Sequence, residues 1–461
     1  MQEKKATVGR RLALIVGAAA LLTPLNSTMI AVALPGIREE FGVSVVSVSW
    51  LITAYLVVVA IAQPIGGRLG DALGSLTVLR AGLFGMAAFS AVAAFSQSYE
   101  MLVVTRSLQG VSAAILNPSA TAFLRKSVDL ERLPVVLGTN GAMVSAGAAS
   151  GPVVGGLILM ALGWRWLFLI NIPVVVVVLL LLGTIPSDQG RGRRSLRIDV
   201  ISVGALVTAF AGLAFLGSAI QSDSGIYPWI AVGVTALGIA AYVSRFRASG
   251  QGVVDLNLFR RFAFARAGAM TAVSNLGFYT TLVALPVYLR GEHDLGAGAI
   301  GLLLFSMSMM NVVFAPIGGR VAASYGVRVG LLTGSLTRLA ASAGILLVVA
   351  FDGTYILGLP LAVVGIGSGL GMAAQQSSGM AAWPQSVAGS AAGTLSLMRY
   401  VGSVAGLSLL AMVLGSSPGA GEFTALMSVV VLVGIVNVVL ASLALSTTVG
   451  RLQALEISVG A

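Results

Sequence analysis

Arg106 is the strongest candidate for a functional residue, because it is a charged side chain inside a long apolar segment, residues 101–124. A charge within the hydrocarbon of a bilayer costs on the order of 3 kcal/mol, so such residues usually serve in proton relays or ligand binding. A structural arginine that extends its side chain to the interface is the alternative. Arg106 lies several residues in from the end of its segment, which favours the functional interpretation.

Acidic residues are absent from the interior of the apolar segments, since all sixteen lie in loops, tails or segment ends. Arg106, Arg338 and Arg399 therefore have no acidic partner within the segments, and an anionic headgroup is one group that could neutralise them. Asp71 lies just before segment 77–95, where a carboxylate favours the positive end of a helix dipole. A simple helix cap would explain it.

Uncharged polar side chains also interrupt the apolar segments. They either line a cavity or form hydrogen bonds between helices, the commoner role for any one of them. Besides Asn26, they include Gln63, Asn117, Asn140, Asn275, Asn311 and Gln375.

Enzyme chemistry finds little support in this sequence. The chain has no cysteine, which excludes disulfides, thiolate metal sites and a cysteine nucleophile. Nothing resembles a phosphate-binding glycine loop, a hydrolase triad or a metal-ligand cluster. We therefore expect no catalytic residue, no metal and no cofactor.

The elements that position these residues are predicted to be membrane-spanning helices. Hydrophobic residues make up 57% of the 461-residue chain and charged residues 9%, and the mean hydropathy is +0.98. Such a chain has too little polar surface for a soluble globule. About 20 apolar residues cross the hydrocarbon of a bilayer, and we place fourteen such spans. They lie near 12–34, 47–69, 77–95, 101–124, 134–160, 166–184, 200–220, 227–244, 264–289, 298–319, 329–350, 354–374, 388–413 and 424–446.

Basic residues indicate the orientation of these spans. With both termini in the cytoplasm, most of the 27 Lys and Arg residues fall at cytoplasmic ends, as expected for a multi-pass protein of the plasma (inner) membrane. The clusters around 191–197 and 245–261 lie where anionic lipid headgroups attract them. They are short, flank spans and lack interleaved aromatic residues, so we expect no nucleic-acid partner.

The second half of the chain repeats the first at a distance of about 250 residues. The sequence Pro-Ile-Gly-Gly-Arg of residues 64–68 recurs at 316–320, and 32–35 recurs at 283–286. Further matched pairs are Gly110 with Gly365, Gly138 with Gly393, Thr139 with Thr394, Met143 with Met398, Gly147 with Gly402, and Gly151 with Gly406. Parallel repeats of this kind are typical of secondary transporters, whose substrate site lies between the repeats near the bilayer midplane.

The repeat also predicts the domain organisation. We expect an N-terminal six-helix half at 1–185, two inserted transmembrane helices with basic loops at 186–262, and a C-terminal six-helix half with a tail at 263–461.

Five motifs, in order along the spans, resemble the major facilitator superfamily, and specifically its fourteen-helix drug:proton antiporter branch. They are residues 67–74 as the loop signature between the second and third helices, 102–110 as the fourth-helix motif, 147–156 as the fifth-helix antiporter motif, 25–35 as the first-helix signature and 164–173 at the start of the sixth helix. The resemblance covers essentially the whole chain and implies the major facilitator fold, with fourteen transmembrane helices as two six-helix halves plus two inserted helices.

The fifth-helix motif has a direct physical interpretation. Gly147, Gly151 and Gly155, four residues apart, form a small-residue stripe that lets another helix approach closely, while Pro152 permits a bend. Helix packing alone would explain the repeated glycines. Pro152, Gly155 and Gly156 are not repeated in the second half, so we expect a role in alternating access.

The resemblance also implies a cytoplasmic gate, a charge-linked contact that holds the outward-facing state. Its predicted residues are Gly67, Arg68, Asp71 and Gly74. The sequence departs from the family at Ala72 and Ser75, where basic residues are usual, and this predicts a weaker or differently partnered contact.

In this family the fourth-helix arginine, here Arg106, is expected to interact with a first-helix acid in proton coupling. The position of that acid is Asn26, which cannot titrate. Three interpretations remain open: an engineered Asp-to-Asn replacement, coupling through another acid such as Asp71, or a natural transporter of an anionic or lipid-like solute. The predicted proton-coupling and substrate residues are Asn26, Arg106, Asn117, Asn275 and Arg399.

The expected function is secondary active export of hydrophobic or amphipathic compounds, of the multidrug type, coupled to protons by alternating access. Its expected partners are the small substrate, protons and membrane lipids, and we expect a monomer. The alternatives are an exporter or flippase of amphiphilic lipids or organic anions, and a non-transporting membrane sensor or scaffold.

Overall fold

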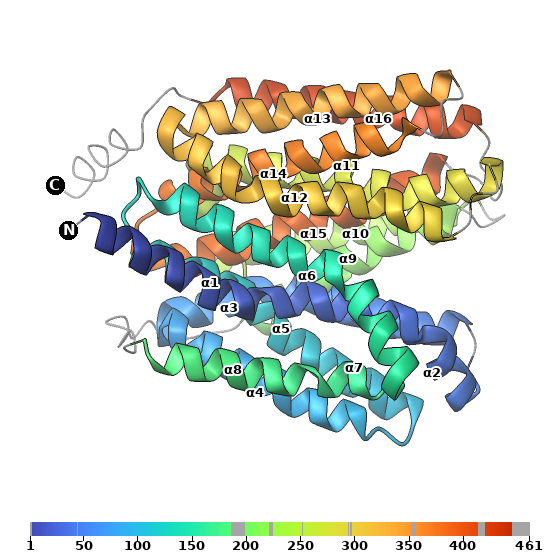
Figure 1. Ribbon diagram of the computed structural model, residues 1–461, viewed down its shortest axis with the longest axis horizontal. Coiled ribbons are helices and arrows are strands. Elements are labelled where there is room, and N and C mark those ends of the chain that lie inside the picture. The colour runs from blue at the N-terminus through green and yellow to red at the C-terminus, as the bar shows by residue number, and fades with distance from the viewer. Residues whose placement is uncertain are drawn as a thin grey trace. The chain divides into compact units, whose positions relative to one another are not determined.

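The computed structural model describes residues 2–43, 45–185, 199–220, 225–250, 252–293, 295, 297–351, 356–413 and 420–444. This part of the chain is helical and contains no strand (Figure 1). It forms two compact units, each of which is continuous in space but not in sequence. The all-α polytopic fold expected from the sequence is confirmed.

The first unit comprises residues 1–129, 139–196 and 383–396. Its elements are α1 (Gln2–Met29), η1 (Ile30–Ala33), α2 (Leu34–Phe41), α3 (Val45–Leu73), α4 (Ser75–Ala94), α5 (Tyr99–Ser127), most of α6 (Leu133–Leu162), α7 (Trp166–Leu169), α8 (Asn171–Gly183), η4 (Gln385–Val387) and the start of α15 (Ala388–Val413). Its apolar core is built by α1, α3, α5 and α7 around Met29, Leu51, Leu102 and Phe168.

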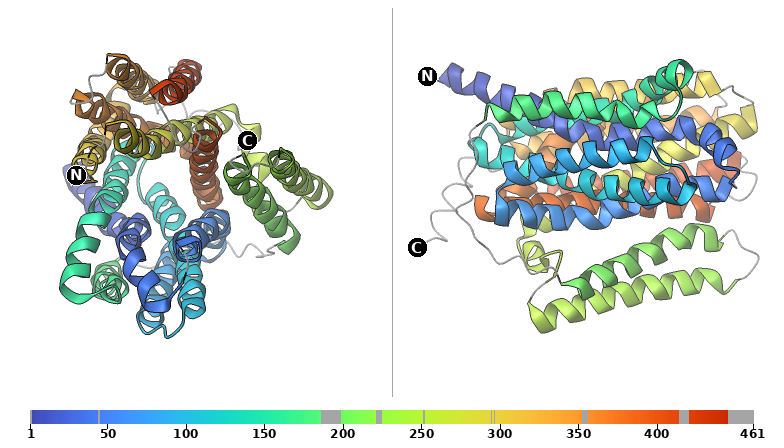
Figure 2. Two further views of the ribbon diagram at one scale, coloured as in Figure 1. Left: turned by 90° about the vertical axis from the view of Figure 1, so that its right-hand side faces the viewer. Right: turned by 90° about the horizontal axis from the view of Figure 1, so that it is seen from below.

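The second unit comprises residues 130–138, 197–382 and 397–461. Its elements are the first turns of α6, α9 (Val200–Ile220), α10 (Tyr227–Ser249), η2 (Leu256–Arg260), α11 (Phe262–His293), α12 (Ala297–Tyr325), α13 (Val327–Ala350), α14 (Gly358–Ala381), the remainder of α15, and α16 (Ala420–Ser442). The inserted helices α9 and α10 lie side by side (Figure 2). The domain boundaries expected from the repeat remain a prediction.

Equivalent turns in the two units support the internal repeat. Gly74 joins α3 to α4 with φ of 92°, and Gly326 joins α12 to α13 with φ of 94°. Residues with a side chain rarely adopt this conformation, so glycine permits a one-residue connection. The preceding helices carry internal prolines at matching places, Pro64 and Pro316.

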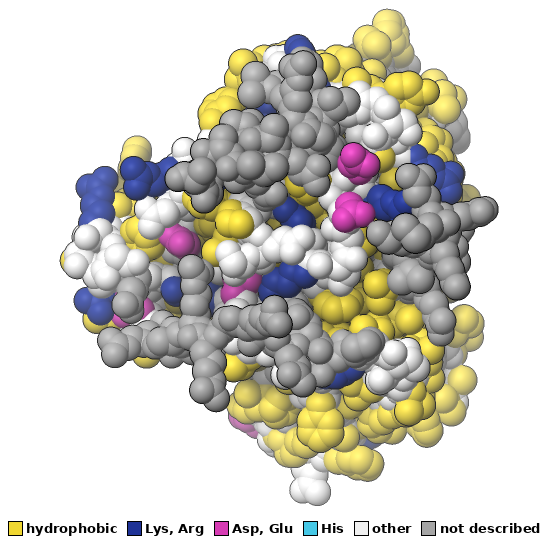
Figure 3. Space-filling view, turned by 90° about the vertical axis from the view of Figure 1, so that its left-hand side faces the viewer, with side chains coloured by type: hydrophobic (Ala, Val, Ile, Leu, Met, Phe, Trp, Pro, Cys, Tyr) yellow, Lys and Arg dark blue, Asp and Glu magenta, His cyan; other side chains and the backbone are white. Residues whose placement is uncertain are grey.

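Large apolar side chains cover the outer surfaces of the helices. Phe84 and Leu180 are each 70% exposed and Met160 is 88% exposed. Lys and Arg side chains lie among the helix ends on the face shown in Figure 3, with hydrophobic side chains toward its margins. Exposed apolar surface of this extent suits contact with lipid.

Every predicted span overlaps a helix. Within the described residues, nine helices are long and apolar enough to cross a membrane, or ten if α6 counts as one bent span. The polytopic architecture is thus confirmed, while the count of fourteen spans remains a prediction. Polar and charged side chains such as Arg106, Gln109 and Asn117 lower the hydropathy of α5, which is therefore not among these nine.

Candidate functional site

Arg106 lies in a buried polar cluster of the first unit, between α1 and α5. Its side chain is fully buried. Nη1 donates to Asn26 Oδ1 at 2.9 Å and to Gln109 Oε1 at 3.2 Å, and Nη2 donates to the Asn26 carbonyl at 2.8 Å. Three neutral oxygens therefore solvate the guanidinium in place of a carboxylate.

A second row of polar side chains holds these acceptors in position. Gln109 Nε2 donates to Ser90 Oγ at 2.6 Å, and Asn171 Nδ2 donates to the same oxygen at 3.2 Å. Asn26 Nδ2 faces Met86 Sδ at 3.4 Å. The network joins α1, α4, α5 and α8.

Aromatic rings complete the environment of the guanidinium. The carbon Cζ of Arg106 lies 4.2 Å from the centroid of the Tyr55 ring and 6.0 Å from that of Phe168. Tyr55 donates its hydroxyl to the Thr23 carbonyl at 3.1 Å, which fixes the ring. Cation–π contacts of this kind partly replace the water that the arginine loses on burial.

The sequence predicted that Asn26 and Arg106 act together, and the structure brings them into contact. Asn117 is also buried on α5, but it lies eleven residues further along, roughly 16 Å away at the helical rise. Asn275 and Arg399 belong to the second unit: Asn275 Nδ2 donates to Thr271 O of its own helix at 2.8 Å, and Arg399 lies near Tyr279. The functional roles of all five residues remain predictions.

Asp71 connects the end of α3 to the start of α15. Its Oδ1 accepts the Gly389 amide at 2.7 Å, and Oδ2 accepts both the amide and the hydroxyl of Ser390 at 2.7 Å. Lys126 Nζ lies 3.8 Å from Oδ1. Because the two amides belong to the first turn of α15, the carboxylate sits at the positive end of that helix.

This arrangement differs from the simple cap of the segment 77–95 that the position of Asp71 suggested. The helix that it caps is α15, about 320 residues later in the sequence. Of the predicted gate glycines, Gly67 packs against Gly389 and Gly74 makes the turn into α4. The gating role of Gly67, Arg68, Asp71 and Gly74 remains a prediction.

The glycines of the antiporter motif seat α6 against α1. A methyl group at Gly147 would lie 2.5 Å from Leu21 O, one at Gly151 would overlap Thr28 Oγ1, and one at Gly155 would lie 2.8 Å from Met29 Cγ. A methyl group at Gly156 would have no atom within 4 Å. The helix bends by 43° between segments 133–151 and 153–162, on either side of Pro152 (Figure 1).

A polar contact that the sequence did not single out joins α2 to the turn before α7. Glu40 accepts from Trp164 Nε1 at 2.7 Å and from the two Nη atoms of Arg165 at 3.1 and 2.5 Å. These hydrogen bonds, led by that from Arg165, hold the pKa of Glu40 below its ordinary value. The motif at 164–173 contains Trp164 and Arg165, but it does not indicate their partner Glu40, which lies about 125 residues earlier in the sequence.

Helices α9 and α10 border an apolar crevice in the second unit. It has a volume of about 320 Å³ and lies between α9, α10, η2 and α15, with Phe210, Leu213, Phe259 and Met398 among its lining residues. Tyr242 closes one end by bonding the backbone N and O of Val254.

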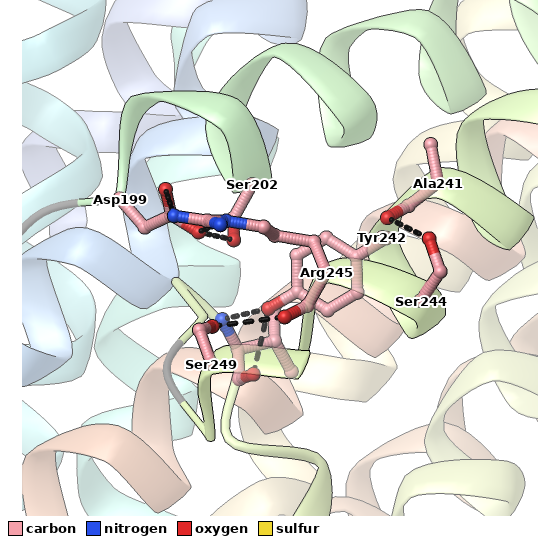
Figure 4. A network of polar contacts seen from close by, with 8 residues as sticks. Asp199, Ser202, Ala241, Tyr242, Ser244, Arg245 and Ser249 are labelled. Atoms are coloured by element: carbon pink, nitrogen blue, oxygen red, sulfur yellow. Dashed lines mark hydrogen bonds and ion pairs between the residues drawn. The ribbon is translucent and has the colours of Figure 1, made fainter. Parts of the chain in front are cut away.

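The ends of α9 and α10 are joined at Asp199, which accepts from Arg245 Nε at 2.9 Å and from Ser202 (Figure 4). The hydrogen bond from Arg245 holds the pKa of Asp199 below its ordinary value. The sequence did not predict the crevice or these contacts, because they depend on how α9, α10 and residues 252–260 pack against one another.

Comparison with known proteins places this architecture in a family. The Major Facilitator Superfamily sequence profile matches residues 16–407. The chain belongs to this superfamily. This superfamily member is therefore a membrane transporter rather than an enzyme, and the superfamily assignment expected from the five motifs is confirmed.

Relatives of this superfamily member include transporters with and without a known substrate. The uncharacterized MFS-type transporter YwoD of Bacillus subtilis is 30% identical over 91% of this chain and 93% of its own. The tetracenomycin C resistance and export protein of Streptomyces glaucescens is 27% identical over 88% of this chain and 76% of its own. The solved structure of the proton:xylose symporter XylE, 12% identical, covers 96% of this chain and 98% of its own with a TM-score of 0.69, which shows the shared fold.

Proposed function

We propose that this superfamily member is a secondary active exporter of hydrophobic or amphipathic compounds in the plasma membrane, which works by alternating access and is coupled to protons where a titratable acid stands beside Arg106. The observation that carries the proposal is the contact of Arg106 with Asn26 in a buried polar cluster. The export of an antibiotic by a relative, and the antiporter glycines that seat α6 on α1, support the direction of transport.

The chemistry of the pair accounts for the coupling. A carboxylate at position 26 would attract the Arg106 guanidinium, and protonation would weaken that attraction because it removes the negative charge. An asparagine has the shape and neutrality of the protonated acid. The Asn26–Arg106 pair thus resembles the state of such a cycle in which the acid is protonated. Proton coupling then requires another titratable residue, or an acid in place of Asn26.

The test is transport in reconstituted vesicles with an imposed pH gradient and a cationic amphipathic dye. We compare the chain as it stands with Asn26→Asp, and with Asn117→Asp as the matched control, a buried amide remote from the Arg106 guanidinium. We expect the pH gradient to drive dye accumulation by the Asn26→Asp variant, at least tenfold above the unchanged chain and the control.

Other outcomes discriminate among the interpretations. Equal proton-driven transport with Asn26 and with the aspartate would move the coupling to another acid such as Asp71. If neither protein moves the dye while an anionic lipid is translocated, the proposal is wrong and the alternative, an exporter of amphiphilic lipids or organic anions, replaces it. Absence of any ligand-dependent change in the labelling of introduced cysteines would instead favour a sensor or scaffold.

A further inference from the structure

The second unit contains a half-buried arginine that the proposed cycle does not use. Arg338, on α13, lines a small pocket between α11, α13, α14 and α16. Its Nη2 is buried and has no hydrogen-bond partner among the described residues. The Ser335 hydroxyl and the Asn437 Oδ1, which line the same pocket, are also buried and unpartnered.

No carboxylate compensates this charge. The described residues that line the pocket include no Asp or Glu. A guanidinium nitrogen that is buried without an acceptor is costly, and proteins usually supply a counter-charge or an acceptor for it. The pocket has a volume of about 30 Å³, which exceeds the ~10–15 Å³ that one water-sized particle requires.

The internal repeat shows which residues of the first unit correspond to the lining of this pocket. Pro35 and Pro286 are matched, as are Gly110 and Gly365, and the positive-φ glycines Gly74 and Gly326. Counting from these pairs, Gly277 stands at the place of Asn26, Val364 at the place of Gln109, and Leu361 at the place of Arg106. Both amides that solvate Arg106 in the first unit are therefore replaced by residues without a side-chain acceptor.

In the second unit the arginine lies on a different helix of the repeat. Arg338 stands at the place of Met86, the residue whose sulfur faces Asn26 in the first unit. Gly277 and Val364 line the pocket together with Arg338. The second unit thus keeps a positive charge among its helices but lacks side-chain acceptors at the two positions equivalent to Asn26 and Gln109.

We propose that this pocket binds a small inorganic anion, for which chloride is the probe, held by the Arg338 guanidinium and the Ser335 hydroxyl. The anion supplies the negative charge that no side chain provides. Hydrogen-bond donors converge on it from α13, and it lies among α11, α13, α14 and α16, so its binding stabilises the packing of these four helices.

The test measures thermal unfolding of the purified protein in detergent, with sodium chloride exchanged for sodium gluconate at constant ionic strength. A ligand that binds only the folded state raises Tm with its concentration, so we expect a saturable rise of about 2 °C or more in chloride. Bromide in place of chloride should give anomalous scattering next to Arg338 in crystals.

Two substitutions at Gly277 provide a matched pair. A methyl group at Gly277 would meet only Val430 and Val433, each at 3.6 Å, which is ordinary van der Waals contact. Gly277→Asn restores the acceptor that the first unit has at Asn26 and should abolish the chloride dependence. Gly277→Ala adds the methyl group without an acceptor and should retain it. Arg338→Met, which copies the repeat partner Met86, should also abolish it.

A Tm of the unchanged protein that is the same in chloride and gluconate, with no bromide signal at Arg338, would overturn the proposal and assign the pocket to water. Chloride dependence that persists in both Gly277→Asn and Arg338→Met would place the anion elsewhere and would also overturn it. Neither result depends on transport, so the proposed export function stands or fails separately.

Discussion

At the scale of single residues, the chain handles buried charge by surrounding it with neutral dipoles. Arg106 has three oxygen acceptors and an aromatic ring in place of a carboxylate. This arrangement keeps the guanidinium charged without fixing a compensating negative charge beside it. The local field at Asn26 is therefore positive, which is why we expect an acid introduced there to respond to the proton gradient.

The Glu40 carboxylate gives a pH prediction at the same scale. Because its folded-state pKa lies below its ordinary value, the contact contributes stability that is fully present above the unfolded pKa and is lost as pH falls through the folded one. The contribution is below about 1 kcal/mol, since both side chains are more than one-third exposed.

Glu40→Gln should therefore lower Tm at pH 7 and leave it unchanged at the acidic end of the range, below the depressed pKa. Unfolding followed from pH 7 downward checks this. A Tm difference between the two proteins that does not shrink with acidification would contradict the assignment.

At the scale of elements, close helix contacts decide which glycines matter. Gly151 faces Thr28 with no room for a methyl group, whereas Gly156, five residues along the same helix, faces open space. Gly151→Ala should destabilise the protein by about 1–3 kcal/mol, because either helix must shift to relieve the overlap, and should slow transport. Gly156→Ala is the matched control and should change stability by less than about 0.5 kcal/mol.

Thermal unfolding and vesicle transport of the two variants measure this difference. Equal effects of the two substitutions would mean that the stripe does not set the packing of α6 on α1.

The Asp71 contact gives a second prediction about elements. Its two carboxylate oxygens accept three hydrogen bonds, from the amides of Gly389 and Ser390 and from the Ser390 hydroxyl. Asp71→Asn would leave one acceptor and turn an NH₂ group toward a donor, so the start of α15 should loosen. Lys126→Gln removes the ion pair at 3.8 Å and the hydrogen bond from Nζ to Ser75 Oγ, but it leaves all three donors on the carboxylate and should have a smaller effect.

The measurement is the rate at which a maleimide labels Ala388→Cys, a buried position at the first residue of α15 in a chain without other cysteines. We expect labelling at least fivefold faster in the Asp71→Asn background than with Lys126→Gln. Identical rates in both backgrounds would show that the carboxylate does not hold α15 in place.

At the scale of the whole molecule, the distribution of basic residues predicts the topology. With the N-terminus in the cytoplasm, the end of α2 lies outside and the end of α10 lies inside. A membrane-impermeant thiol reagent should therefore label Glu39→Cys in intact cells, and Ser249→Cys only after permeabilisation. Both positions are exposed helix ends. The reverse pattern would contradict the orientation, and labelling of both from one side would contradict the number of spans between them.

Much of the architecture could be predicted from the sequence because the relevant forces are local. An apolar segment that crosses the bilayer must be helical, because its backbone polar groups have to form hydrogen bonds within the segment. The recurrence of residues 64–68 at 316–320 indicated duplication. The pairing of Arg106 with Asn26 was predicted from the family motifs. Its remaining partners, Gln109, Ser90 and Tyr55, were not, because helix rotation decides which polar face meets which.

The sequence alone thus indicated a duplicated, all-helical membrane protein with an arginine in its predicted fourth span and no acidic residue inside the spans, because composition and periodicity act on each segment by itself. Only the tertiary structure decided that Asp71 caps α15, and that Gly151 admits no methyl group while Gly156 does. It also decided that Arg338 borders a pocket lined by Gly277 and Val364, the residues that correspond to Asn26 and Gln109 of the first unit. Those facts depend on how far apart helix surfaces lie, a distance set by the packing of residues that are remote in sequence.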